Sequence, residues 1–366
     1  MLGLLELRRR RLQFTLIGLI VTLISYLVAM INGLGLGLNE LAGSALRNFD
    51  ADAIAYAETS GLSVIRSELS QDTIDAILST PGVREGAPLG YVAANVRYPD
   101  GTIDNAAFLG FDPGTIAEPR VVEGRSLEPG ERGVMLADRA FLRASGYRLG
   151  DTVPVALRLQ TREFRIVGVV EEGYFFFQPA VYISRSDWRE LRYGQADDAP
   201  VASIVLLKGK GLPGTRAPGF EIVDKGTAFA NIEGVAGQQS TVSALRAFGY
   251  LIGALVVGVF FYVLTLQKVP HIGVLKALGA SNSYVFRQLL AQVLTVSVLG
   301  LAVALPLALA TGRAIQRLPN PVPIAFDTRT VATTAVLLLV ASLVGAAFSL
   351  RRILGTDPII ALGQQQ

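Results

Sequence analysis

The sequence predicts an integral membrane α-helical protein with four transmembrane helices in a 1 + 3 arrangement and a large extracytoplasmic α+β domain between helices one and two. Two observations predict this fold class: the apolar segments and the composition of the stretch between the first two. Apolar segments occupy residues 12–38, 247–266, 289–311 and 331–350, and each reaches the roughly 20 residues needed to cross hydrocarbon. Residues 39–246 between the first two have ordinary globular composition. Because backbone groups find no water in lipid, the apolar segments must be helical.

Positive charge flanks these segments unevenly, which predicts orientation. The arginines and lysines gather in residues 1–11, 267–288 and 351–366, which the positive-inside rule makes cytoplasmic. The outer loop 312–330 also carries arginines, but fewer. We therefore expect a multi-pass protein of the cell membrane with both termini cytoplasmic. The net charge of only +3 gives no indication of nucleic-acid binding.

The first apolar segment is too long for the h-region of a secretory signal, so we interpret it as an uncleaved anchor. The run Gly33-Leu34-Gly35-Leu36-Gly37 near its end is interpreted as a flexible exit from the bilayer. The chain has no cysteine, which excludes disulfides, thiolate metal sites and a cysteine nucleophile.

Alternating apolar residues between turn signals predict strands in the outer domain, and amphipathic stretches predict helices. The expected strands are Gly90–Tyr98, Asn105–Phe111, Thr152–Leu159, Glu163–Val170 and Val201–Leu207, and the expected helices are Ser70–Leu78, Asp138–Ala144 and Ser186–Tyr193. A broken helical stalk is expected over Asp224–Arg246, leading into the second span.

Four consecutive aromatic residues, Tyr174–Phe177, stand in this domain. Side chains alternate between the two faces of a strand, so four in a row cannot all enter one core from a strand. The pattern predicts that some of them contact a partner domain or an amphiphile.

The segment between the second and third spans predicts a short helix on the cytoplasmic face. Pro270 suits a first helical turn, while Ile272, Leu275 and Leu278 form an apolar ridge. Gly279 is a natural stop, and Ser281 or Asn282 can cap the next helix. A soluble partner could push such an element, although the same pattern is also typical of a plain amphipathic connector.

Several segments resemble the FtsX/MacB-like ABC-transporter permeases (type VII, mechanotransmission). The quoted pieces are the coupling run 273–280 (Gly-Val-Leu-Lys-Ala-Leu-Gly-Ala), the tail 357–362 (Asp-Pro-Ile-Ile-Ala-Leu), and the runs 16–20, 86–90 and 260–268. Within the family, the chain looks most similar to the HrtB heme-exporter permease and DevC-like subgroup. It departs from many members at His271, where an acidic residue is common.

The resemblance implies a homodimer of permeases bound to two ABC ATPase subunits, which hold the ATP and Mg; this subunit itself carries no cofactor. Its own sequence contains no phosphate-binding loop of the G-x-x-x-x-G-K-[ST] type. The expected contacts with the ATPase are Pro270, His271, Ile272, Leu275, Lys276, Leu278, Asp357 and Pro358. His271 is the only histidine, and we interpret it as a helix-surface or ATPase-contact residue rather than a metal or heme ligand. No catalytic residue and no metal site are expected.

The outer ends of the first two spans supply the candidate substrate site. The leading cargo is heme, with Met30 as a thioether ligand and further contacts from Glu40, Glu233, Phe248 and Tyr250. An apolar packing role for Met30 and solvent exposure of the glutamates remain alternatives. Gly249 and Gly253 form a G-x-x-x-G pair that suits close helix packing, against the first span or the dimer mate, or that is merely tolerated in lipid.

We therefore expect a non-catalytic permease subunit of an exporter that extrudes an amphiphilic substrate from the membrane lipid. Export of a lipid, peptide or antibiotic is an alternative. A second alternative, from a different class, is an FtsX-like transducer that activates an extracytoplasmic cell-wall hydrolase. A membrane-bound enzyme is disfavoured because no nucleophile–base pair or metal constellation is present.

Overall fold

The computed structural model describes residues 11–157, 160–171, 173–196, 198–277, 280–318 and 322–354. It divides into two compact units. A helical unit contains residues 1–37 and 239–366, and an outer unit contains Leu38–Gln238. Two long helices run from one unit into the other, so their ends belong to the outer unit.

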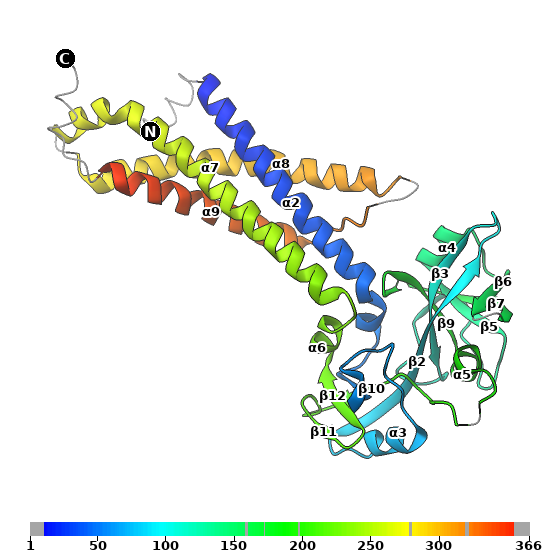
Figure 1. Cartoon of the computed structure of the whole chain (residues 1–366). Helices are drawn as coiled ribbons and strands as arrows, with labels where there is room; N and C mark the ends of the chain where they lie inside the picture. The colour runs from blue at the N-terminus through cyan, green and yellow to red at the C-terminus, as the bar shows by residue number, and fades with distance from the viewer. Residues whose placement is uncertain are drawn as a thin grey trace. The chain divides into compact units, whose positions relative to one another are not determined.

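Four long helices make up the helical unit (Figure 1). They are α2 (Arg11–Asn48), α7 (Val235–Ala277), α8 (Asn282–Ile315) and α9 (Thr328–Leu354). Each is long and apolar enough to cross a membrane, and each contains one of the segments expected from the sequence. All four contribute to a buried core, for example through Val21, Phe261, Val293 and Ala346. The fold class predicted from the sequence is therefore confirmed.

Small residues let these helices approach closely. A methyl group on Gly249 would meet Val28 at 2.9 Å, and one on Gly253 would meet Ile24 at 3.3 Å. The G-x-x-x-G pair of α7 thus packs on α2 of the same chain, as small residues at that spacing allow.

The glycine run at 33–37 is not the flexible exit that the sequence suggested. All of its residues lie within α2. Gly33 and Gly37, one turn apart, face the segment before α9, where Ala325 N–H donates to the Gly33 carbonyl at 3.0 Å and Pro323 lies directly over Gly37. Gly35, on another face, contacts Arg246 of α7. The glycines make room for neighbouring backbone, which is a packing role.

The structure also corrects the prediction of a separate short helix that begins at Pro270. Helix α7 continues without a break from Val235 to Ala277. Proline in a helix leaves one carbonyl unpaired, and its ring crowds the preceding turn, yet the helix is maintained here. The expected cap after it is confirmed, because Ser281 Oγ accepts the Tyr284 N–H at 3.3 Å and α8 begins there.

The outer unit is built on one continuous set of paired strands in the order β11-β12-β1-β10-β2-β3-β9-β5-β7-β4. The bounds are β1 (Ala53–Ala57), β2 (Val83–Arg97), β3 (Ile103–Phe111), β4 (Val121–Gly124), β5 (Val134–Asp138), β6 (Thr152–Leu157), β7 (Gln160–Val170), β8 (Tyr174–Phe175), β9 (Gln178–Ser184), β10 (Ile204–Gly209), β11 (Arg216–Ala217) and β12 (Phe220–Asp224). Strand β2 joins two regions, because residues up to Leu89 pair with β10 and residues from Gly90 pair with β3.

The second region closes on itself, since β6 pairs with both β2 and β7. Strands β2, β3, β9, β5, β7 and β6 therefore form a ring. Every second residue of each strand points into it and is buried, as in Val96, Phe108 and Phe164. Trp188 of α5 (Arg185–Tyr193) packs over Gly90 and Gly110, where a β-carbon would collide with the indole.

Three further short helices and a 3-10 turn complete the outer unit: α3 (Gln71–Leu78), α4 (Arg139–Ser145), α6 (Lys225–Ala230) and η1 (Glu58–Ser60). The predicted helices match α3, α4 and α5, and the predicted strands match β2, β3, β6, β7 and β10 within a few residues, apart from an earlier start of β2. Strands β1, β4, β5, β8, β9, β11 and β12 were missed. The expected stalk is broken at Gly234, which has φ +84°, between α6 and α7.

Candidate functional site

The last turns of α2 lie inside the core of the outer unit. Ala42, Ala45, Leu46 and Phe49 are buried there with strands β1, β3 and β9. Non-helical dihedral angles at Gly43 mark a kink between Ala42 and Ala45. The end of a membrane-crossing helix is thus a structural part of the outer domain.

The aromatic residues 174–177 contact this helix end, and only the first two of them, Tyr174 and Phe175, form a strand, β8. Phe175 pairs with Gln178, so Phe176 and Phe177 form a two-residue hairpin loop with φ of +51° and +63°. Such loops require left-handed residues, which are rarely bulky. Because of the turn, the three phenylalanine rings do not alternate as they would along a strand. Phe175 is buried, and the ring centroids of Phe176 and Tyr91 lie 4.9 Å apart. The side chain of Phe177 is 41% exposed.

Backbone hydrogen bonds tie the hairpin to α2. Phe176 N–H donates to the Ala42 carbonyl at 3.0 Å, and Phe177 N–H donates to the Leu41 carbonyl at 2.9 Å. The Tyr174 N–H donates to Ser44 Oγ at 2.9 Å. Two of these bonds use carbonyls next to the kink and the third uses the Ser44 hydroxyl, so the strained turn and the kinked helix satisfy each other's polar groups.

Lys225, the first residue of α6, caps the end of α2. Its ammonium donates to the carbonyls of Arg47 at 2.9 Å and Phe49 at 2.7 Å. The last carbonyls of a helix have no partners within the helix and carry partial negative charge, so a cation stabilises them. Partial burial lowers the pKa of Lys225, because desolvation penalises the charged form. We call Lys225 with these two carbonyls the clasp.

Two further contacts surround the clasp. The guanidinium of Arg47 lies 4.8 Å from the centroid of the Phe229 ring of α6 and pairs with Glu40 at 2.9 Å. Gly43 packs against Phe229 and Ile232. Glu40, a candidate substrate residue, is therefore engaged in an ion pair about two turns before the end of α2.

Glu233, another candidate, is held between α6 and α7. Ser63 Oγ donates to its Oε1, while Oε2 is buried and has no protein partner among the described residues. The hydroxyl oxygens of Tyr56 and Ser60 are also buried and unpartnered within that part of the chain. Burial, and secondly the charge of Glu233, raise the pKa of the Tyr56 and Tyr91 hydroxyls. Glu233 thus anchors the start of α7 to the loop around Ser63.

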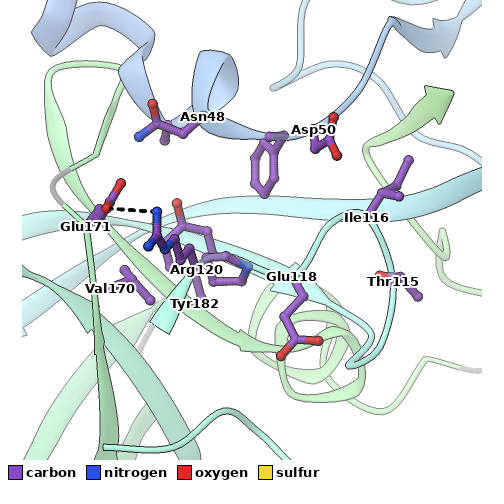
Figure 2. Close-up of a pocket in the computed structure, with 12 residues that line it drawn as sticks. Asn48, Asp50, Thr115, Ile116, Glu118, Arg120, Val170, Glu171 and Tyr182 are labelled. Atoms are coloured by element: carbon purple, nitrogen blue, oxygen red, sulfur yellow. Dashed lines mark ion pairs between the residues drawn. The ribbon is translucent and has the colours of Figure 1, made fainter. Parts of the chain in front are cut away.

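A pocket of about 470 Å³ opens beside the end of α2 (Figure 2). Its lining comes from α2 and the following residues, the loop after β3, the end of β7, and β9: Ala45, Asn48, Phe49, Asp50, Thr115, Ile116, Glu118, Pro119, Arg120, Val170, Glu171 and Tyr182. Figure 2 shows Glu171 and Arg120 on one side, with Thr115 and Ile116 on the other. The volume falls within the range of small-molecule sites.

The helical unit holds the other candidate substrate residues. Tyr250 accepts a hydrogen bond from Asn32 Nδ2 at 3.2 Å, and the same amide donates to Thr334 Oγ1 at 2.8 Å. Met30 is half-buried, and Phe248 is 61% exposed. Glu40 and Glu233 belong to the outer unit, so the five candidates are divided between two separately described units.

The side chains of the expected ATPase contacts are not among those that the structure describes. Helix α7 includes Pro270, His271, Ile272, Leu275 and Lys276 in its last turns, but only their backbone is described. Leu278, Asp357 and Pro358 lie outside the described residues.

Sequence reasoning missed the clasp and the pocket. Lys225 gave no signal, because a single lysine before a short helix is common. Asn32 did give a sequence signal, because an amide side chain within an apolar span typically bonds a partner on a neighbouring helix. The loop Thr115–Arg120 had no distinctive pattern.

Comparisons with known proteins agree with this architecture. Residues 14–211, more than half of the chain, match the family described as MacB-like periplasmic core domain, and residues 240–358 match FtsX-like permease C-terminal. A Staphylococcus haemolyticus protein named as a hemin transport system permease protein, HrtB, is 24% identical over 98% of this chain and 97% of its own length. An uncharacterized ABC transporter permease of Mycobacterium tuberculosis is 24% identical over 97% of this chain and 96% of its own length.

Among solved structures, the periplasmic region of MacB from Actinobacillus actinomycetemcomitans is 14% identical, with a TM-score of 0.36, and covers 51% of this chain and 94% of that one. The family matches are decisive, together with four helices long and apolar enough to cross a membrane and an α+β domain that lies between the first two in sequence. The chain belongs to the ABC transporter permeases of the FtsX/MacB type.

Proposed function

We propose that this permease exports an amphiphile, with heme as the first candidate, as a homodimer driven by two separate ATPase subunits through mechanotransmission. The observation that carries the mechanical part is the burial of the α2 end in the core of the outer domain. A helix that crosses the membrane and ends as a core element passes its displacement to the domain that surrounds it.

The clasp supports the same route. Lys225 joins the end of α2 to α6, and α6 is separated from α7 only by residues 231–234. Displacement of either helix end therefore acts on both. Packed elements respond as units rather than deforming continuously, so a small shift at the cytoplasmic side has a defined path outward.

The ATPase contact is tested by Leu275→Asp. A charge placed at the centre of an apolar contact typically costs about 2 kcal/mol or more at a hot spot, so we expect loss of co-purification with the ATPase. Val274→Asp is the matched control, because it places the same charge at the neighbouring residue, which is exposed and is not among the expected contacts. Unchanged co-purification and unchanged cargo-stimulated hydrolysis by Leu275→Asp would refute this contact.

Heme is supported by similarity to the relatives named for hemin transport. The outer ends of the first two spans offer sulfur, phenol and carboxylate groups in Met30, Tyr250, Glu40 and Glu233, and no histidine. Weak, reversible ligation by such groups suits release of the cargo. We expect a heme spectrum unlike that of bis-histidine coordination.

The cargo is tested by adding heme to the purified complex and recording its absorption spectrum. Met30→Ala with Glu233→Ala should weaken heme binding by about tenfold, equivalent to about 1.4 kcal/mol, and leave ATPase pairing intact. Ser63→Ala is the matched control, because it removes the hydrogen bond to Glu233 and keeps the carboxylate. Absence of saturable heme binding would place export of a lipid, peptide or antibiotic, or control of a cell-wall hydrolase, first.

A further inference from the structure

We propose that the outer-domain pocket beside the end of α2 binds a monovalent cationic amphiphile, with an ammonium or phosphonium centre on an apolar body. This inference goes beyond the proposed export of heme. It concerns only the outer unit, and it holds whether or not heme is the cargo.

The floor of the pocket fits an apolar body. Phe49, Val170 and Tyr182 are at most 4% exposed, and Ile116 covers one side. The Tyr182 ring is fixed by edge contacts with Phe49 at 6.3 Å and Phe111 at 6.4 Å between centroids. Buried rings in fixed orientations provide a preformed surface, and aromatic faces attract cations as well as apolar groups.

The rim carries three carboxylates, Asp50, Glu118 and Glu171, and one cation, Arg120. Outside the pocket, Lys208 pairs with Asp50 at 2.6 Å, and the ammonium of Lys225 acts on the same carboxylate. Asp50 is therefore balanced, whereas Glu118 pairs with no lysine or arginine among the described residues. A monocation beside Glu118 would neutralise that carboxylate, which would repel a dianionic molecule such as heme.

Glu118 is the carboxylate left without a cation. The Gly114 N–H donates to its Oε2 at 2.7 Å, and Ser126 Oγ donates to its Oε1. Hydrogen bonds from neutral donors fix the position of the carboxylate without cancelling its charge. Among the described residues, no lysine or arginine forms an ion pair with it.

The pair that faces Glu118 is easily opened. Arg120 and Glu171 are 3.8 Å apart, with side chains 84% and 58% exposed, and exposed pairs of this kind contribute little to stability. An incoming cation can therefore take Glu171 from Arg120 at small cost. The guanidinium would then turn to solvent.

The end of α2 connects the pocket with the clasp. Ala45, Asn48 and Phe49 form one wall, and the ammonium of Lys225 bonds the carbonyls of Arg47 and Phe49 at the end of that wall. Because the same wall is held by the clasp, a bound ligand also supports one position of the helix end. Occupancy and helix position are thus linked.

Tetraphenylphosphonium and tetraphenylborate provide a matched pair of probes with similar shape and opposite charge. Binding is measured by equilibrium dialysis on the purified full-length permease, with detergent alone as the blank. We expect saturable binding of the phosphonium and at least about tenfold weaker binding of the borate, a difference of about 1.4 kcal/mol.

Variants at the rim should change the affinity in opposite directions. Glu171→Gln should weaken phosphonium binding about threefold and Arg120→Gln should strengthen it about threefold, as expected for exposed charges. Both positions are exposed, so folding is not at risk. Ile116→Trp should fill the pocket and abolish saturable binding, with an unchanged unfolding temperature as its folding control.

Lack of saturable phosphonium binding by the wild type, equal affinity for both probes, or identical shifts in Glu171→Gln and Arg120→Gln would overturn the proposal. Heme titration of the same variants separates this site from the cargo site. Their heme spectra should match that of the wild type, and a changed heme affinity would show that the pocket takes anions and would overturn the charge argument.

Discussion

Replacing Lys225 by methionine removes the ammonium of the clasp and keeps a side chain of similar length. The carbonyls of Arg47 and Phe49 then lose their donor. We expect the end of α2 to separate from α6 more often, while the strands of the outer unit stay paired. Cargo-stimulated ATP hydrolysis should fall, because displacement of α2 would reach the outer domain less completely.

The magnitude follows from the two bonds. A hydrogen bond from a charged donor typically contributes about 1.5–3 kcal/mol. Desolvation, which lowers the pKa of Lys225, offsets part of this, and the side chain is only partly buried. About 2 kcal/mol of local stability is therefore expected for the pair of bonds together, equivalent to roughly 30-fold faster local opening.

Hydrogen exchange measured by mass spectrometry on the full-length protein tests this estimate. Peptides that cover residues 44–50 and 225–232 should exchange roughly 30-fold faster in Lys225→Met, as local opening sets exchange there. Lys210→Met is the matched control, because Lys210 is an exposed lysine of the same unit. Equal exchange in wild type and Lys225→Met, or equal acceleration by both variants, would refute the role of the clasp.

Three further outcomes are expected. Gly37→Ala should lower the unfolding temperature by forcing the backbone of the segment before α9 away, a cost of about 1–3 kcal/mol, whereas Gly18→Ala, with open space around it, should not. The Arg125 guanidinium, followed by a backbone hydrogen bond, lowers the pKa of Glu131 from 4.5 to about 2. The ion pair therefore contributes its full stabilisation of the folded state above pH 4.5 and loses it as the pH falls towards 2. For an exposed pair this contribution is below about 1 kcal/mol. Acid unfolding curves should show that Arg125→Gln abolishes this part of the pH dependence. Arg148→Cys should react with an impermeant label on intact cells, and a cysteine in the last ten residues only after permeabilisation; the reverse pattern would contradict the expected orientation.

Much of the outer unit was predictable where the pattern was local. The strand Asn105–Phe111 and the helix Ser186–Tyr193 correspond to β3 and α5 within two residues, because their alternation and caps lie within the segments themselves. Strands β1, β5 and β9 were missed. They are buried along their whole length or nearly so, and short continuous apolar runs carry no periodicity.

The candidate site depends on contacts between residues far apart in the chain, so little of it could be predicted from the sequence. Gly33–Gly37 looked flexible because glycine favours turns, yet the approach of Pro323 and Phe326 makes those glycines a packing surface. Four aromatic residues in a row, Tyr174–Phe177, predicted a contact with a partner domain or an amphiphile, but two carbonyls beside the kink of α2 accept hydrogen bonds from a turn there. Neither partner is near in sequence.

By itself, the sequence determined the four spans, their 1 + 3 order and the α+β character of the domain between the first two. Those properties follow from local rules, since lipid forces each apolar segment to satisfy its own backbone and short-range periodicity sets strands and helices. Only the tertiary structure decided that the end of α2 is a core element, that Lys225 caps it, and that Phe49, Glu118 and Tyr182 enclose one pocket. Those features arise from packing between residues far apart in the chain, where side-chain shape and unpaired polar groups select the partners.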